Sequence, residues 1–189
     1  MRRNLCAAED HVVFSRPGLL SLMPIDPASR KLETELASGD IATNGPLWLC
    51  AWVAVLRDMS ESFPLARVIG VTLGSDGFVW LEKGLKGENG KVEVHHVTAP
   101  SVEVVDTTCA GDVFHGVYTL GLGRGDSVCQ AATVACAAAA LKCRAYGRHG
   151  CPSADELQDF LKTWAPEVTQ CGNCSTVTTL HDCRYCGGV

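Results

Sequence analysis

Apolar residues gather in short runs that turn residues separate, and this pattern predicts strands along the middle of the chain. The turn residues 74–77 (GSDG) stand between two apolar runs and predict a hairpin. A turn is also expected at 15–18 (SRPG), after the first run. The strands that we expect are 11–14, 67–73, 78–81 and 91–97.

Helical patterns occupy most of the second half. We expect helices at 29–36, 47–56, 111–121, 127–142 and 154–164. The run 47–56 is apolar on every side, so it predicts a buried helix, although a strand fits the same pattern. Gly121, Gly123 and Gly125 are expected to end the helix that begins near 111. Because strands come first and helices second, the chain predicts an α/β domain whose sheet the later helices cover.

Composition and charge narrow the functional classes. The chain has 189 residues, 47% of them apolar and 20% charged, which is ordinary for a globular domain. A net charge of −5 argues against a nucleic-acid or anionic-membrane partner. The apolar runs 47–56 and 134–141 are too short to span a membrane, and the N-terminus lacks a secretory signal. We therefore expect a cytoplasmic protein with no nucleic-acid or membrane partner.

The segment 106–112 (DTTCAGD) carries the chemistry of interest, because it is expected to lead into a helix. The first N–H groups of a helix lack partners within it, and the small residues from Cys109 to Gly111 would let an anion approach them. Asp112 would follow in the first turn, where a carboxylate can accept the proton of an attacking alcohol. The pattern thus suits phosphoryl transfer. The alternative is structural, since Asp near a helix N-terminus is stabilising by itself.

The stretch 104–122 (VVDTTCAGDVFHGVYTLGL) resembles the C-terminal signature of the ribokinase-like (PfkB) carbohydrate kinases, D-T-x-G-A-G-D. Three further stretches, 11–20, 68–82 and 137–157, resemble other parts of that family in the same order. The resemblance covers about residues 10 to 165. It implies a ribokinase-like, Rossmann-type three-layer α/β/α core over residues 1–165, truncated at its N-terminus. The implied reaction transfers the γ-phosphoryl group of ATP to a small sugar or polyol with Mg²⁺, and K⁺ and a homodimer stay open.

The resemblance also assigns roles to single residues. They are a catalytic base at Asp112; an anion hole at Cys109, Ala110 and Gly111; nucleotide contacts at Thr72, Gly74 and Gly77; and a monovalent-cation region at Asp106, Thr108 and Gly147.

Three departures from the family pattern weaken the expectation of activity. Cys109 stands where the family usually has Gly, so a positive φ there would strain the backbone. Arg16 stands where many relatives have a Glu that helps to organise magnesium. The family's N-terminal half, which holds the sugar, has no counterpart in this sequence. A remnant that binds nucleotide without turnover is therefore the alternative function.

The last residues, 166–189, form a Cys-rich tail that we expect to be disordered. Two C-x-x-C pairs, Cys171 with Cys174 and Cys183 with Cys186, are separated by eight residues. Such pairs can bind zinc, although the spacer is shorter than usual. A tail zinc module or a redox dithiol is the alternative to disorder.

Overall fold

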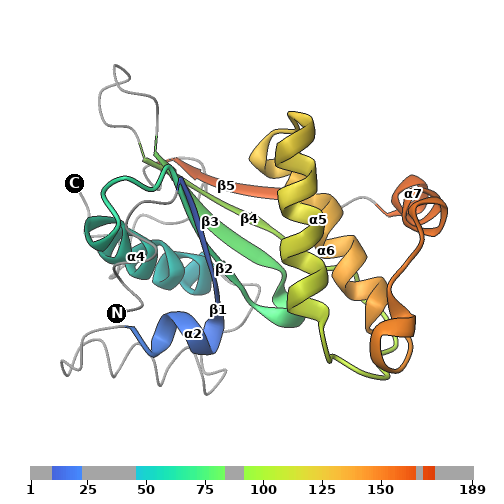
Figure 1. The fold of residues 1–189 in the computed structure, drawn as a ribbon. Helices are drawn as coiled ribbons and strands as arrows, with labels where there is room; N and C mark the ends of the chain where they lie inside the picture. Colours follow the sequence, from blue (N-terminus) through green and yellow to red (C-terminus); the bar gives the residue numbers. More distant parts are fainter. Residues whose placement is uncertain (1–9, 23–45, 84–91, 165–167, 173–189) are drawn as a thin grey trace. The chain divides into compact units, whose positions relative to one another are not determined.

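The computed structural model describes residues 10–22, 46–83, 92–164 and 168–172 (Figure 1). The chain divides into two compact units. The first unit comprises residues 1–72, 79–96 and 169–189, and the second comprises 73–78 and 97–168. Each unit is described by itself below.

A five-stranded sheet lies in the first unit, apart from three strand-end residues. Its strands follow the order β1-β2-β3-β4-β5. They are β1 (His11–Ser15), β2 (Val68–Thr72), β3 (Phe78–Lys83), β4 (Val92–Val97) and β5 (Val168–Gly172). β1 runs parallel to β2, with Val12 opposite Ile69. The four strands expected from sequence are confirmed, whereas β5 falls within the segment expected to be a disordered tail.

In the described part of this unit, two helices accompany the sheet. α4 (Pro46–Ser62) is longer than the helix expected at 47–56, and the alternative of a strand there is wrong. Trp52, Val53 and Leu56 have no exposed surface, so its apolar faces are buried as the sequence pattern predicts. α2 (Arg16–Leu20) occupies the place of the expected turn, because Ser15 caps it by accepting a hydrogen bond from the Gly18 N–H at 3.2 Å.

The second unit contains the helices α5 (Ala110–Arg124), α6 (Val128–Lys142) and α7 (Ala154–Thr163). α5 and α6 approach closely, since a Cβ placed on Gly121 would lie 3.0 Å from the Cβ of Ala131. The expectation that Gly121 and Gly123 end α5 is wrong. Small residues facing a neighbouring helix continue α5, and Gly125 ends it with a φ of 90°.

The turn between β2 and β3 also belongs to the second unit. It contains a short 3₁₀ helix, η1 (Gly74–Asp76), and ends at Phe78. The ring of Phe78 lies 4.9 Å from that of Phe114 and 5.8 Å from that of Tyr118, both on α5. These aromatic contacts fix the turn against the helix that carries the candidate site.

Several expectations fall on residues that the structure does not describe. The helix expected at 29–36 is one, and the tail beyond Gly172 is another. Within the described ranges, none of the helices combines the length and the hydropathy needed to cross a lipid bilayer.

Candidate active site at the start of α5

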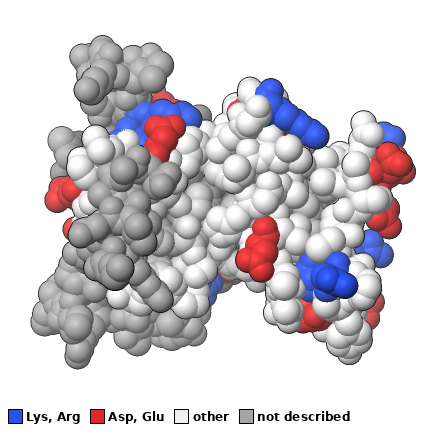
Figure 2. Space-filling view, in the orientation of Figure 1, with Lys and Arg blue, Asp and Glu red and all other residues white. Residues whose placement is uncertain are grey.

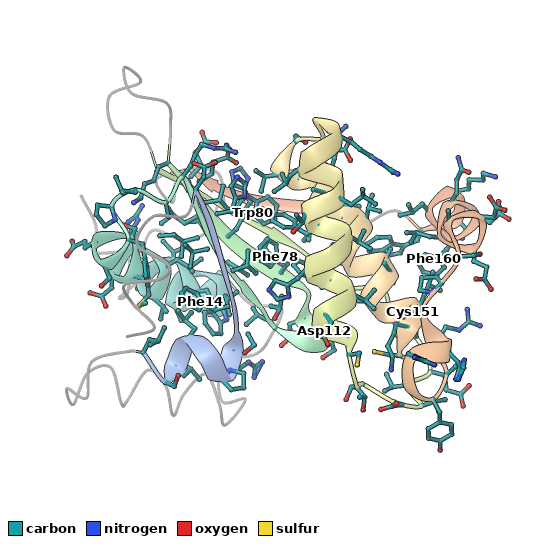
Figure 3. The ribbon with its side chains drawn as sticks, viewed as in Figure 1. Phe14, Phe78, Trp80, Asp112, Cys151 and Phe160 are labelled. Carbon is teal, nitrogen blue, oxygen red and sulfur yellow. The ribbon has the colours of Figure 1, made fainter. Side chains whose placement is uncertain are left out.

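Asp112 lies in the first turn of α5, on the exposed surface of the second unit (Figure 3). Its carboxylate has no hydrogen-bond or ion-pair partner among the residues that the structure describes. The helix begins where the sequence predicts, because the first bond of its ladder runs from the Val113 N–H to the Cys109 carbonyl at 3.0 Å. The carboxylate is therefore available to a molecule bound at this helix end.

The backbone amides at the start of α5 are only partly used by the protein itself. The Ala110 N–H donates to the Thr107 carbonyl at 3.1 Å, which closes a turn. The N–H groups of Cys109, Gly111 and Asp112 have no partner in the described part of the chain. Three donors thus remain free where the helix dipole places partial positive charge. This arrangement can bind an anion. Cys109 and Gly111 belong to the expected set 109–111, and the Asp112 N–H is a further free donor in the described part of the chain.

Cys109 has an unusual backbone conformation. Its φ of 63° and ψ of 7° place it in the left-handed region, and it is the one non-glycine residue with positive φ in the described ranges. Its side chain is exposed and makes no capping hydrogen bond. A side chain in this conformation costs about 1–2 kcal/mol. Cys109, where the family usually has glycine, therefore has a conformation in which glycine would relieve strain.

Gly111 is not required by the packing of the protein. A Cβ added there would have no neighbouring atom within 4 Å. Glycine in a helix is nevertheless less favourable than alanine by about 0.5–1 kcal/mol. Close approach of a ligand to the backbone at residue 111 would explain why glycine stands there.

The Asp106 carboxylate accepts hydrogen bonds that stabilise the loop before α5. Its Oδ1 accepts from the Thr108 N–H at 2.9 Å, and its Oδ2 accepts from the Gly147 N–H at 2.7 Å. Bonds from the backbone and hydroxyl of Thr108 and from the backbone of Gly147, with a smaller effect of Lys142, hold the pKa of Asp106 well below its ordinary value. The three residues assigned to a monovalent-cation region are thus brought together.

Lys142 was not singled out from the sequence, although it contacts Asp106. It is the last residue of α6, and its side chain has no exposed surface. Its Nζ donates to the main-chain carbonyl of Asp106 at 2.9 Å and lies 3.6 Å from Oδ2. The one sequence feature that could have drawn attention to Lys142 is its single charge at the end of a long run of alanine and other small residues.

The residues expected to contact nucleotide fall in both units. Thr72 ends β2 in the first unit, and its Oγ1 donates to the Phe14 carbonyl at 3.4 Å. Gly74 and Gly77 belong to the turn in the second unit, with φ of 65° and 91°. A Cβ on Gly77 would lie 2.0 Å from the Val97 carbonyl oxygen, so local backbone packing accounts for this glycine.

A groove in the second unit was also missed by the sequence. It has a volume of about 570 Å³ and lies where the end of α6 and the 3₁₀ helix η2 (Gly147–Gly150) meet α7. Charged side chains of both signs line it, together with Cys151 and Phe160 (Figure 3). On the visible face of the described residues, acidic and basic side chains are interspersed, with no broad patch of one sign (Figure 2).

The proposed tail zinc ligands lie largely outside the described residues. Cys171 falls within β5, whereas Cys174, Cys183 and Cys186 are not described. The described residues contain no group of three or more His, Cys, Asp or Glu side chains suited to a metal ion.

Known proteins resemble this chain over most of its described length. The family described as pfkB family carbohydrate kinase matches residues 53–155, which is more than half of the chain. A ribokinase from Lactococcus lactis is 33% identical over 93 residues, which are 49% of this chain and 28% of that protein.

Two solved structures show the same fold. One, from Agrobacterium tumefaciens and provisionally described as a ribokinase, is 28% identical with a TM-score of 0.60 over 85% of this chain and 42% of its own. Arabidopsis thaliana ribokinase, complexed with ribose and ATP, is 21% identical with a TM-score of 0.58, over 85% and 43%. The ribokinase-like α/β fold expected from sequence is confirmed, and the chain spans less than half the length of each of these relatives.

Proposed function

Because the chain belongs to the pfkB family of carbohydrate kinases, we propose that it acts in the ATP-dependent phosphorylation of a sugar or polyol hydroxyl. The observation that carries this proposal is the start of α5, where three backbone donors are free and an exposed carboxylate has no partner among the described residues. The ribose and ATP held by the Arabidopsis relative agree with these classes of substrate.

In this proposal the free amides bind the phosphoryl group during its transfer. The group carries negative charge on its oxygens, and amides at a helix N-terminus stabilise that charge without reorganising. Gly111 lets the phosphoryl oxygens approach, since its position has no side chain and no neighbour within 4 Å. The Cys109 N–H, which has no partner in the described part of the chain, would be a further donor at the same helix end.

Asp112 is the general base. The substrate oxygen forms a bond to the γ-phosphorus while the bond from that phosphorus to the β,γ-bridging oxygen breaks and ADP leaves. The hydroxyl proton passes to the Asp112 carboxylate, so charge and atoms balance. The exposure of this carboxylate and its lack of a partner among the described residues suit it to accept a proton from a bound substrate.

In this proposal magnesium enters the reaction with the nucleotide. The described residues offer no cluster of three metal-binding side chains. Arg16 also stands at the N-terminus of α2 where the family resemblance expects an acid. Mg²⁺ commonly keeps waters and phosphate ligands, so ATP itself can carry it. No step of the proposal therefore depends on a protein-bound metal.

The proposal is tested with two variants of the full chain, Asp112→Asn and Gly111→Ala. Asp112→Asn should lower sugar-dependent ADP release by about 10²–10⁴-fold and leave ATP affinity nearly unchanged, because only the proton acceptor is lost. Gly111→Ala should weaken ATP binding, yet stabilise the free protein by about 0.5–1 kcal/mol, since its methyl group meets only open space.

Calorimetric ATP titration, coupled ADP assays and thermal unfolding provide the three readouts. Turnover that survives Asp112→Asn would refute the role of the base. ATP binding that is unaffected by Gly111→Ala would refute the phosphate site. Wild-type protein that binds ATP without turning over any sugar would instead support the nucleotide-binding remnant.

A further inference from the structure

Lys142 is a buried cation in the second unit. Its side chain has no exposed surface, although lysine is rarely buried unless its charge is paired. Removing an ammonium group from water costs several kcal/mol, which its surroundings must offset. Among the described residues, Nζ contacts two oxygens of Asp106, namely the main-chain carbonyl at 2.9 Å and Oδ2 at 3.6 Å. The ammonium is therefore dedicated to one residue of the loop before α5.

That loop is tied to the end of α6 at several points. The N–H groups of Val105 and Asp106 both donate to the Cys143 carbonyl, at 2.8 and 3.1 Å. The Asp106 carboxylate holds Thr108 on one side and Gly147 on the other. Only Cys109 separates Thr108 from the first residue of α5. The position of the Lys142 charge thus bears directly on the geometry of the free amides.

We propose that the Lys142 ammonium serves as a built-in monovalent cation that positions residues 106–109 for phosphate binding, so that the protein needs no added K⁺. The inference rests on the proposed function. A main-chain carbonyl oxygen and a carboxylate oxygen around one positive charge are the ligands that hard cations prefer. Asp106, Thr108 and Gly147, to which the family resemblance assigned a monovalent-cation region, meet where this ammonium lies. Lys142 is a positioning residue, because it acts through Asp106.

The test uses Lys142→Met in the full chain, because methionine keeps much of the side-chain volume and removes the charge. The matched control is Lys162→Met, which removes an exposed lysine paired with Asp159 on α7. ATP affinity is measured by calorimetry in choline chloride, KCl and NH₄Cl at equal ionic strength. Wild type and Lys162→Met should bind ATP equally in all three salts. Lys142→Met should lose about tenfold or more in choline, and K⁺ or NH₄⁺ should restore most of this loss.

Two results would overturn the inference. Wild-type affinity that rises with K⁺ but not with choline would show that the site still requires a cation. Loss in Lys142→Met that neither K⁺ nor NH₄⁺ repairs would show a purely structural role. If Lys142→Met does not fold in any of the salts, Lys142→Gln, which keeps a donor without charge, is measured instead with the same two expectations. Failure of Lys142→Gln to fold in every salt would also overturn the inference.

Failure of the proposed function is separable from failure of this inference. If the wild type binds no ATP in any salt, the proposed function falls. The melting temperature of Lys142→Met then becomes the readout. A recovery in KCl or NH₄Cl relative to choline chloride, absent from Lys162→Met, would support the built-in cation, and equal melting in all three salts would overturn it.

Discussion

Replacing Cys109 with glycine should stabilise the protein, although a side chain is removed. Cys109 has a φ of 63°, and its thiol is exposed, so the substitution relieves strain and sacrifices little packing. The left-handed conformation costs a side-chain-bearing residue about 1–2 kcal/mol. Glycine also lowers the free energy of unfolding by about 0.5–1 kcal/mol, because it gives the unfolded chain greater conformational freedom. The net gain is about 0.5–1 kcal/mol, and the melting temperature should rise by about 1–4 °C for a chain of this size.

Urea and thermal unfolding of three variants measure this gain. Cys109→Ala keeps the Cβ and should leave stability within about 0.5 kcal/mol of wild type. Cys129→Gly is the matched control, because Cys129 lies in the first turn of α6, where glycine should destabilise by about 0.5–1 kcal/mol. The reasoning would be refuted if Cys109→Gly lowered stability as Cys129→Gly does, since the backbone at 109 would then not be strained.

Two further predictions concern glycine packing and thiol exposure. Gly77→Ala should lower the free energy of unfolding by about 3 kcal/mol or more, because its Cβ would lie 2.0 Å from a backbone oxygen. Gly74→Ala, with open space around it, should lower it by about 1 kcal/mol. Equal losses in urea unfolding would contradict this prediction. Maleimide should label exposed Cys109 quickly, and ATP should slow this labelling but not that of Cys129, about 20 Å along α6 from the Asp106 loop. Burial raises the pKa of the Cys136 thiol to about 12, so Cys136 should stay unlabelled until the protein unfolds. Peptide mapping by mass spectrometry would show whether the cysteines are labelled in a different order.

The sequence predicted the elements with strong local signals and missed those that tertiary contacts decide. The start of α5 followed from small residues before Asp112, because helix N-termini have local chemistry. Its end did not, since Gly121 is a turn signal by itself but a close-packing residue once α6 lies against it. The short helix at Arg16–Leu20 was missed because Ser15 and Pro17 also fit a turn.

The candidate site was likewise only partly predictable. Its conformation at Cys109 was foreseen as a possible strain, because a positive φ is what the usual glycine of this motif would permit. The use of the Ala110 amide in a turn was not foreseen, since local sequence does not say which donors the preceding loop consumes. The Lys142 contact joins residues 36 positions apart, and no local pattern encodes such a pair.

The division into two units has a consequence for how the chain can be shortened. The boundaries 72/73, 78/79, 96/97 and 168/169 mean that the polypeptide passes between the units four times. A fragment spanning 97–168 would therefore lack Phe78 and leave the rings of Phe114 and Tyr118 without one of their partners. The second unit is therefore not one continuous piece of chain, and a fragment that is meant to keep these ring contacts must include residues 73–78.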